Sequence, residues 1–200
     1  KPFDPRLIVM IAPAVAKAAM ESGVATRPIE DFDAYRARLT NFVWHSGLLM
    51  KPIFSAAKQA PKCIVYAEGE DERVLRAAQV VVDEGLARPL LLGRPDRITQ
   101  RIADFGLRLA PGKDCEVVNL FDPAIYGDAA DDYYLLKRRD GVSRAMAKVE
   151  MRSRCTLLAA MLVRQGRADA MLCGTFGNYG QHLRHVRDVI GLRPDTQTLA

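Results

Sequence analysis

The sequence predicts an α/β fold with a mostly parallel sheet flanked by helices. Short apolar runs with the composition of buried strands occur at 62–67, 88–93, 115–120 and 170–173. The segments between them contain stretches with helical periodicity, and this alternation is typical of right-handed crossovers between parallel strands. Hydrophobic residues make up 49% and charged residues 26% of the chain, which is enough apolar material for a core.

Residues 1–27 are expected to form a separate small unit. An Ala-rich helix is predicted at 11–20, with Pro13 in its first turn, where proline is tolerated. Glu21-Ser22-Gly23 offers a stop. A helix this short gains most of its stability from packing, so it requires a partner surface elsewhere.

Residues 28–60 are interpreted as a helical linker that docks on another part of the protein. The linker starts after Arg27-Pro28, and Asp31 or Asp33 can cap a helix that continues to about Phe42. The isolated His45 in this segment is interpreted as a structural or solvated side chain rather than a ligand.

Residues 61–200 contain the alternating elements of the α/β domain. The first strand is followed by a helix over 72–84, with Asp71 as its N-cap and Gly85 as its stop. A strand at 88–93, a helix at 96–105 ended by Gly106, and a strand at 115–120 are expected next. A loop at 121–132 then leads to helices within 132–150, which are broken at Asp140-Gly141 and have Ser143 as a cap. The last expected elements are a helix at 153–165 ended by Gly166, a strand at 170–173, and a helix after Gly177.

Two turns follow strands and are candidates for a ligand site, because open α/β sheets bind ligands beyond the carboxyl ends of their strands. The turn at 68–71 is acidic and would repel phosphate unless Arg73 and Arg76 offset its charge; a simple capping turn is the alternative. The Gly-rich turn Gly174–Gly180 can present backbone N–H groups to an anion at a helix N-terminus. A tight connection without a ligand is equally consistent with it. No Lys-Ser/Thr follows these glycines, so the turn is not a Walker loop.

The sequence gives little support for metal or nucleophilic chemistry. His182 and His185 are spaced i, i+3, but Arg184 and Arg187 flank them and make a cation site unattractive, so no metal site is expected. No G-x-S-x-G elbow is present, and residue chemistry alone names no catalytic residue.

The net charge and the spacing of the cysteines limit which partners and which cellular location are expected. The net charge of +5 is mild, with no basic run or aromatic array of a nucleic-acid groove, and the apolar stretch at 7–19 is too short for a membrane span. We therefore expect neither nucleic acid nor membrane as a partner. The four cysteines lack C-x-x-C spacing, Cys63 and Cys173 are predicted to be packed thiols, and a reducing cytoplasmic location fits best.

Two sets of residues carry a family resemblance. The segment at 64–78, Ile-Val-Tyr-Ala-Glu-Gly-Glu-Asp-Glu-Arg-Val-Leu-Arg-Ala-Ala, together with 166–184, resembles the phosphate acetyl/butyryltransferase family. The segments Phe3-Asp4-Pro5-Arg6 and 11–19 resemble the C-terminal end of the catalytic region of bacterial malic enzymes. In this order they resemble the large NADP-dependent malic enzymes that carry a C-terminal phosphotransacetylase-like domain.

The resemblance implies a division of the chain and a role for it. Residues 1–27 would be the tail of the malic enzyme catalytic region, 28–60 a linker, and 61–200 the first half of the transferase-like domain, with 198–200 entering the next strand. The NADP and divalent metal (Mg or Mn) sites for oxidative decarboxylation of malate to pyruvate would lie upstream, with no cofactor in this chain. The domain would be regulatory, sensing acetyl-CoA or a related acyl-CoA and helping to build a homo-oligomer.

The resemblance also implies which residues contact the ligand. The acyl-CoA contacts carried over from it are Gly174, Thr175, Asn178, Tyr179, Arg184, Glu70 and Arg73. Active transferases have a His-Ser-Thr-like segment where this chain reads Gly177-Asn178-Tyr179, which argues against phosphoryl-acetyl exchange while leaving binding through N–H groups and Arg184. An active phosphate acetyltransferase domain and a purely structural oligomerisation module are the alternatives.

Overall fold

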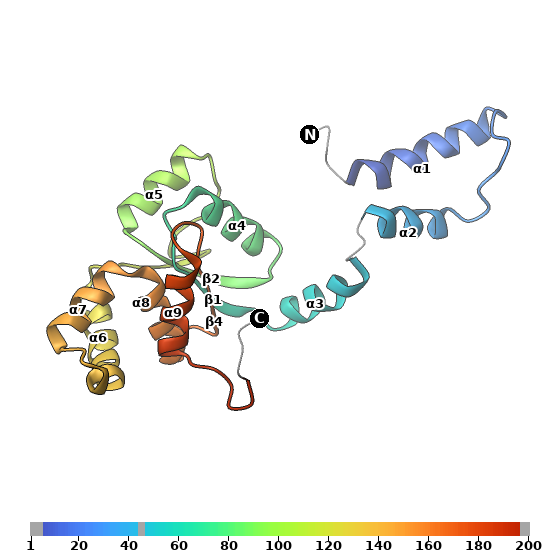
Figure 1. Ribbon diagram of the computed structural model, residues 1–200. Coiled ribbons are helices and arrows are strands. Elements are labelled where there is room, and N and C mark those ends of the chain that lie inside the picture. Colours follow the sequence, from blue (N-terminus) through green and yellow to red (C-terminus); the bar gives the residue numbers. More distant parts are fainter. Residues whose placement is uncertain (1–5, 44–46, 197–200) are drawn as a thin grey trace. The chain divides into compact units, whose positions relative to one another are not determined.

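A computed structural model describes residues 6–43 and 47–196 (Figure 1). The chain divides into two compact units, one up to Ala56 and one from Ala57 onward. His45 and the strand expected at 198–200 lie outside the described residues. Among the described helices, none combines the length and the apolar character needed to span a bilayer.

The first unit contains α1 (Arg6–Glu21) and α2 (Phe32–Val43), which contact each other; α3 (Gly47–Gln59) crosses the boundary between the units. The prediction for the start of the first helix was wrong, because α1 begins five residues earlier and Pro13 lies buried in its interior. Pro13 lacks an N–H, so it gives up one helical hydrogen bond. The predicted stop is confirmed, since Gly23 has a φ of +73°. Asp31 rather than Asp33 caps α2, accepting the N–H groups of Asp33 and Ala34 at 2.9 Å.

The second unit is built on a four-stranded parallel sheet, as predicted. Its strands are β1 (Lys62–Tyr66), β2 (Ala87–Leu92), β3 (Glu116–Val118) and β4 (Ala170–Leu172), in the order β3-β2-β1-β4. All three pairings are parallel. The chain therefore moves from β1 outward to β2 and β3, then returns to place β4 on the other side of β1.

Helices cover both faces of the sheet (Figure 1). Side chains alternate along a strand, so Val65 and Leu90 enter one core while Tyr66 and Leu91 enter the other. The Tyr66 face is covered by α4 (Glu72–Asp83) and α5 (Pro95–Asp104). The Val65 face is covered by α6 (Pro123–Lys137), α7 (Arg144–Ser153), α8 (Cys155–Arg164) and α9 (Tyr179–Val189), with the 3-10 turn η1 (Arg138–Asp140) between α6 and α7.

The helix α8 is the centre of the larger core. Every residue from Thr156 to Leu162 is buried, because α8 packs on β1 and β4 and is also contacted by α6, α7 and α9. The predicted helix at 153–165 is divided by Arg154, whose φ of −127° and ψ of 91° leave the helical region. The break allows α7 and α8 to take different directions.

The expected loop at 121–132 is instead most of α6, and this prediction was wrong. Asp122 caps the helix by accepting the N–H of Ala124 at 2.9 Å, and Pro123 occupies the first helical position, where its missing N–H is no loss. Burial of Ala129, Ala130 and Tyr133 then outweighs the cost of Gly127 in the helix. Asp71 and Ser143 are confirmed as N-caps of α4 and α7.

Candidate functional site

The sheet order places a topological switch point between β1 and β4. The connection leaving β1 runs toward β2, whereas β4 lies on the opposite side of β1. The turn after β1 (68–71) and the turn after β4 (174–180) therefore flank one crevice at the carboxyl edge of the sheet. Open parallel sheets bind their ligands at this position.

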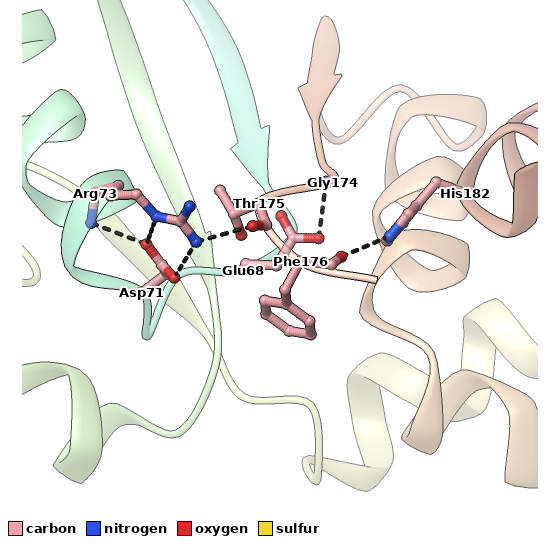
Figure 2. Close-up of polar contacts among 7 residues, drawn as sticks. All are labelled: Glu68, Asp71, Arg73, Gly174, Thr175, Phe176 and His182. Atoms are coloured by element: carbon pink, nitrogen blue, oxygen red, sulfur yellow. Dashed lines mark hydrogen bonds and ion pairs between the residues drawn. The ribbon is translucent and has the colours of Figure 1, made fainter. Parts of the chain in front are cut away.

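Side chains from three different places hold the turn after β4 (Figure 2). Glu68 accepts the N–H of Gly174 through Oε1 at 3.0 Å, and Arg73 donates from Nη2 to the carbonyl of Thr175 at 2.8 Å. The Nε2 atom of His182 lies 2.9 Å from the carbonyl of Phe176. Three consecutive residues of the turn are thus fixed, so the turn is pre-organised before any ligand arrives.

His182 connects this turn to the core helix α8. Its Nδ1 atom lies 2.7 Å from the hydroxyl of the buried Thr156. A carbonyl can only accept, so Nε2 is assigned the proton; in this neutral tautomer Nδ1 accepts from the Thr156 hydroxyl. Both ring nitrogens are therefore engaged. Burial lowers the pKa of the neighbouring His185, and Arg154 lowers it further. Across residues 6–43 and 47–196 no group of three His, Cys, Asp or Glu side chains is placed to hold a metal ion.

The turn leaves backbone donors available. Asn178 caps α9 by accepting the N–H of Gly180 at 2.8 Å. The N–H groups of residues 175–179 have no acceptor within the described part of the chain. Gly177 has a φ of +98°, and a Cβ there would lie 2.8 Å from Nε2 of His182. Glycine is required at this position for both reasons.

The acidic turn after β1 is charge-paired. Arg94 binds Glu70 in bidentate fashion, with both distances 2.9 Å, and also donates its backbone N–H to it. These hydrogen bonds hold the pKa of Glu70 below its usual value. Arg73 binds Asp71 at 3.0 Å, which likewise lowers the pKa of Asp71. Most of the acidic charge that would repel an anion is therefore offset.

A cavity of about 510 Å³ lies at this edge, and we call it the carboxyl-edge cleft. It is lined by the end of β2, by residues of the turns that follow all four strands, by one residue of α5 and by the start of α8: Ala67, Glu68, Gly69, Glu70, Asp71, Leu92, Gly93, Arg94, Arg101, Leu120, Phe121, Cys155 and Phe176. Phe121 and Phe176 remain 48% and 64% exposed. A separate hollow of about 330 Å³ lies at the opposite, amino end of the strands, between Cys63 and Glu116. The cleft is the better ligand candidate because parallel sheets bind ligands at the carboxyl end.

The structure brings some of the predicted site residues together and leaves others apart. Glu70 lines the cleft, and Arg73 reaches Thr175 across the crevice. Gly174 and Tyr179 instead line an adjoining hollow of about 270 Å³ with His182 and Leu183. Tyr179 is 74% exposed.

The remaining predicted contacts are peripheral or structural. Arg184 is exposed on α9 and does not line these hollows, and Asn178 serves as the α9 cap. The Thr175 hydroxyl is buried and has no hydrogen-bond partner among the described residues.

Sequence reasoning assigned no role to four residues of the site, although two of them, Glu68 and Phe176, lie in the turns that it proposed as ligand sites. Glu68 and His182 hold the turn, and Phe121 and Phe176 line the cleft. Glu68 directly follows a buried strand, and this position was a signal in the sequence for a place at the ligand-binding edge of the sheet. The roles of the other three residues depend on how β3, β4 and α8 come together in the folded protein. The prediction that Cys173 is packed was wrong, because Cys173 is exposed and lies just beyond β4, which is at the edge of the sheet formed by the described strands; Cys63 is half-buried.

Comparison with known proteins gives a consistent picture. The family model for phosphate acetyl/butaryl transferase matches residues 48–200. The chain is 54% identical to an NAD-dependent malic enzyme of Rhizobium meliloti over 193 residues, covering 96% of the chain and 25% of that protein. It is 52% identical to an NADP-dependent malic enzyme of Haemophilus influenzae, covering the whole chain and 26% of that protein.

A solved structure supports the fold independently of sequence. A phosphotransacetylase from Streptococcus pyogenes superimposes with a TM-score of 0.65 at 24% identity, covering 74% of this chain and 45% of that one. The chain spans about a quarter of the length of the malic enzymes that it matches. Both parts of the resemblance seen in the sequence are confirmed. The chain therefore belongs to the phosphate acetyl/butaryl transferase family, and it resembles the member of that family that forms the C-terminal part of bacterial malic enzymes.

Proposed function

We propose that this chain is the regulatory and assembly part of an NADP-dependent malic enzyme and that it senses acetyl-CoA. The parent reaction would be the oxidative decarboxylation of malate to pyruvate, carried out with NADP and a divalent metal outside these residues. The observation that carries the proposal is the carboxyl-edge cleft at the β1–β4 switch point, in a chain similar to malic enzymes over almost its whole length.

The lining of the cleft suits an acyl-CoA. Leu120, Phe121, Cys155 and Phe176 offer apolar surface to the methylene groups of a pantetheine arm. The N–H groups of residues 175–179 can donate to a carbonyl or a phosphate at the start of α9. Because Glu70 and Asp71 are paired with arginines, an anionic ligand can approach the crevice.

Binding is favoured over group transfer by the residues of the turn. The segment Gly177-Asn178-Tyr179 contains no serine or threonine, and the Asn178 side chain is occupied by capping α9. The Thr175 hydroxyl is buried, so it is poorly placed to contact a phosphate. These residues support a sensor rather than a transferase.

Regulation requires that acetyl-CoA bind two states of the parent enzyme with different affinity. The pre-organised turn can link ligand binding to the rest of the domain, because its hydrogen bonds connect it to three elements. Arg73 connects it to α4, Glu68 to the end of β1, and His182, through Thr156, to α8. A ligand that displaces the turn would shift all three elements together.

The test is the response of malate oxidation to acetyl-CoA in the full-length protein, followed by NADPH absorbance. We expect a saturable inhibition in the wild type and a response shifted by about tenfold or more in acetyl-CoA concentration for Gly177→Ala. The added methyl group would push His182 away from the Phe176 carbonyl and strain the backbone at a φ of +98°.

The matched control is Gly85→Ala. Gly85 also has a positive φ, of +65°, but a Cβ there meets nothing within 4 Å and the residue lies at the end of α4, away from the cleft. Its basal rate and its response should match those of the wild type. A wild-type rate unaffected by saturating acetyl-CoA would contradict a regulatory role, and formation of acetyl phosphate from acetyl-CoA and phosphate would instead favour an active transferase.

A further inference from the structure

Glu68 is a buried carboxylate at the floor of the carboxyl-edge cleft. It follows β1 directly and is only 7% exposed. It lines the cleft and also a smaller hollow of about 190 Å³ that includes Thr156 and His182. A buried carboxylate is costly unless its oxygens are hydrogen-bonded.

Among the described residues, only one of the two carboxylate oxygens of Glu68 has a hydrogen-bond partner. Oε1 accepts the N–H of Gly174 at 3.0 Å, whereas Oε2 receives no hydrogen bond from residues 6–43 or 47–196. No lysine or arginine in those ranges forms an ion pair with Glu68, in contrast to Glu70 and Asp71, which are both paired with arginines. Glu68 therefore keeps an acceptor available where two hollows meet.

The chemistry of this acceptor restricts what can lie against it. A phosphate is repelled by a carboxylate that has no cation paired with it. A bound metal ion would need further ligands, and the described residues place no group of three candidate ligands together. The remaining candidate is a neutral N–H or O–H donor. It would belong to a ligand group with apolar surface that can pack against Phe121, Cys155 and Phe176.

We infer that Oε2 of Glu68 accepts a hydrogen bond from an amide N–H of the pantetheine arm of the acyl-CoA. The inference rests on the proposed function and adds a specificity-determining residue and an orientation to it. The pantetheine arm lies against Glu68 and the aromatic side chains, and the phosphates lie away from Glu68. Glu68 thus binds the ligand with one oxygen while it holds the Gly174 turn with the other.

The direct test compares Glu68→Gln with the wild type by titrating acetyl-CoA into the full-length protein. Glutamine keeps a carbonyl oxygen for the Gly174 N–H but replaces the second acceptor with an NH₂ donor. We expect acetyl-CoA and S-acetylpantetheine to bind about tenfold more weakly, because a hydrogen bond to a charged acceptor is lost. ADP, which lacks the pantetheine arm, should bind equally well to both proteins.

Glu116→Gln is the matched control. It makes the same chemical change in an exposed carboxylate of β3 that lies at the amino end of the strands, away from the cleft. Its affinity for S-acetylpantetheine should stay within about twofold of the wild type, because this side chain does not line the cleft. An equal loss in both variants would point to general charge or folding effects and would overturn the inference.

If Glu68→Gln does not fold, a chemically modified ligand tests the same hydrogen bond in the wild-type protein. S-acetylpantetheine with both amide nitrogens methylated should compete about tenfold less well than its parent for the wild-type protein. Equal competition would overturn the assignment of Glu68. If the wild type binds no acetyl-CoA, the proposed function fails as well; if it binds and Glu68→Gln binds equally, only this inference fails.

Discussion

Two threonine hydroxyls at the Gly-rich turn differ in whether they are hydrogen-bonded. The Thr156 hydroxyl is bonded to Nδ1 of His182 at 2.7 Å, whereas the Thr175 hydroxyl is buried without a partner among the described residues. An unsatisfied buried hydroxyl destabilises the folded state, while a satisfied one stabilises it. The two residues therefore form a natural pair for comparison.

Replacing each threonine with valine should affect stability in opposite directions. We expect Thr175→Val to leave the free energy of unfolding unchanged or raise it by up to about 1 kcal/mol. Thr156→Val should lower it by about 1–3 kcal/mol, because Nδ1 of His182 loses its donor. Urea denaturation of both variants measures the difference. A loss of more than about 1 kcal/mol for Thr175→Val would show that its hydroxyl has a partner in solution.

The residues that hold the turn show how far sequence reasoning reaches at this scale. The Gly-rich turn was found from Gly174, Gly177 and Gly180 because glycine has a recognisable conformational role. Glu68 had a partial signal in its place directly after a strand. Its hydrogen bond to Gly174, 106 positions away, and that of His182 to Phe176, 6 positions away, depend on the folded turn and have no signal of this kind.

At the scale of elements, the pairing of Glu70 with Arg94 joins the turn after β1 to the start of α5. Gly93 allows this approach, since a Cβ there would lie 2.9 Å from the Cγ of Glu70. The hydrogen bonds from Arg94 lower the pKa of Glu70. A lowered carboxyl pKa stabilises the folded protein above the ordinary value and loses this effect as the pH falls through the folded value.

We therefore expect Glu70→Gln to change the acid limb of the stability curve. The variant should be less stable than the wild type at neutral pH. The difference should shrink as the pH falls below the ordinary carboxyl pKa of 4.5 and should vanish once the pH has fallen through the lowered pKa of folded Glu70, where the wild type loses its ion pair. Thermal unfolding as a function of pH measures both effects. Asp104→Asn, an exposed carboxylate on α5, controls for net charge. A constant difference at all pH values would contradict the role of this ion pair.

Elements were predictable where their end signals were local. Asp71, Ser143, Gly85 and Gly166 mark helix ends in the sequence, and the structure confirms them. The start of α6 carried the same kind of signal in Asp122-Pro123, but the interior Gly127 favoured a loop in the sequence. Burial of Ala129 and Tyr133 in the core decided the outcome, and such tertiary packing has no local signal.

At the scale of the whole molecule, the first unit has an apolar face on α1 that the other described residues of that unit leave exposed. Ile8, Ile11 and Val15 are spaced i, i+3, i+7 on α1 and are 41%, 53% and 62% exposed. A contiguous apolar stripe of this kind marks an interaction surface. It supports the assembly role within the proposed function.

Charge placed on this stripe should weaken assembly. We expect Val15→Glu to reduce the mass of the full-length protein in sedimentation equilibrium, because a carboxylate would have to be buried in the contact. Lys17→Ala alters an exposed polar residue of the same helix and should leave the mass unchanged. An unchanged mass for Val15→Glu would show that the stripe does not join subunits.

The fold class, the parallel sheet and the position of the site followed from the alternation of strands and helices. The strand order did not, because the return of β4 to the side of β1 depends on the packing of α8 against both strands. That order creates the switch point, and with it the cleft that carries the proposed function.

Calorimetric titration of acetyl-CoA into the full-length protein tests this account most directly. The wild type should give a saturable heat of binding. Arg184 does not line the cleft, so Arg184→Ala should weaken the affinity only through the loss of a positive charge in the second turn of α9. Arg187→Ala, which removes the same charge one turn further along α9, should retain more of the affinity. The absence of any heat or thermal shift with the wild type would contradict acetyl-CoA sensing and would leave a purely structural module.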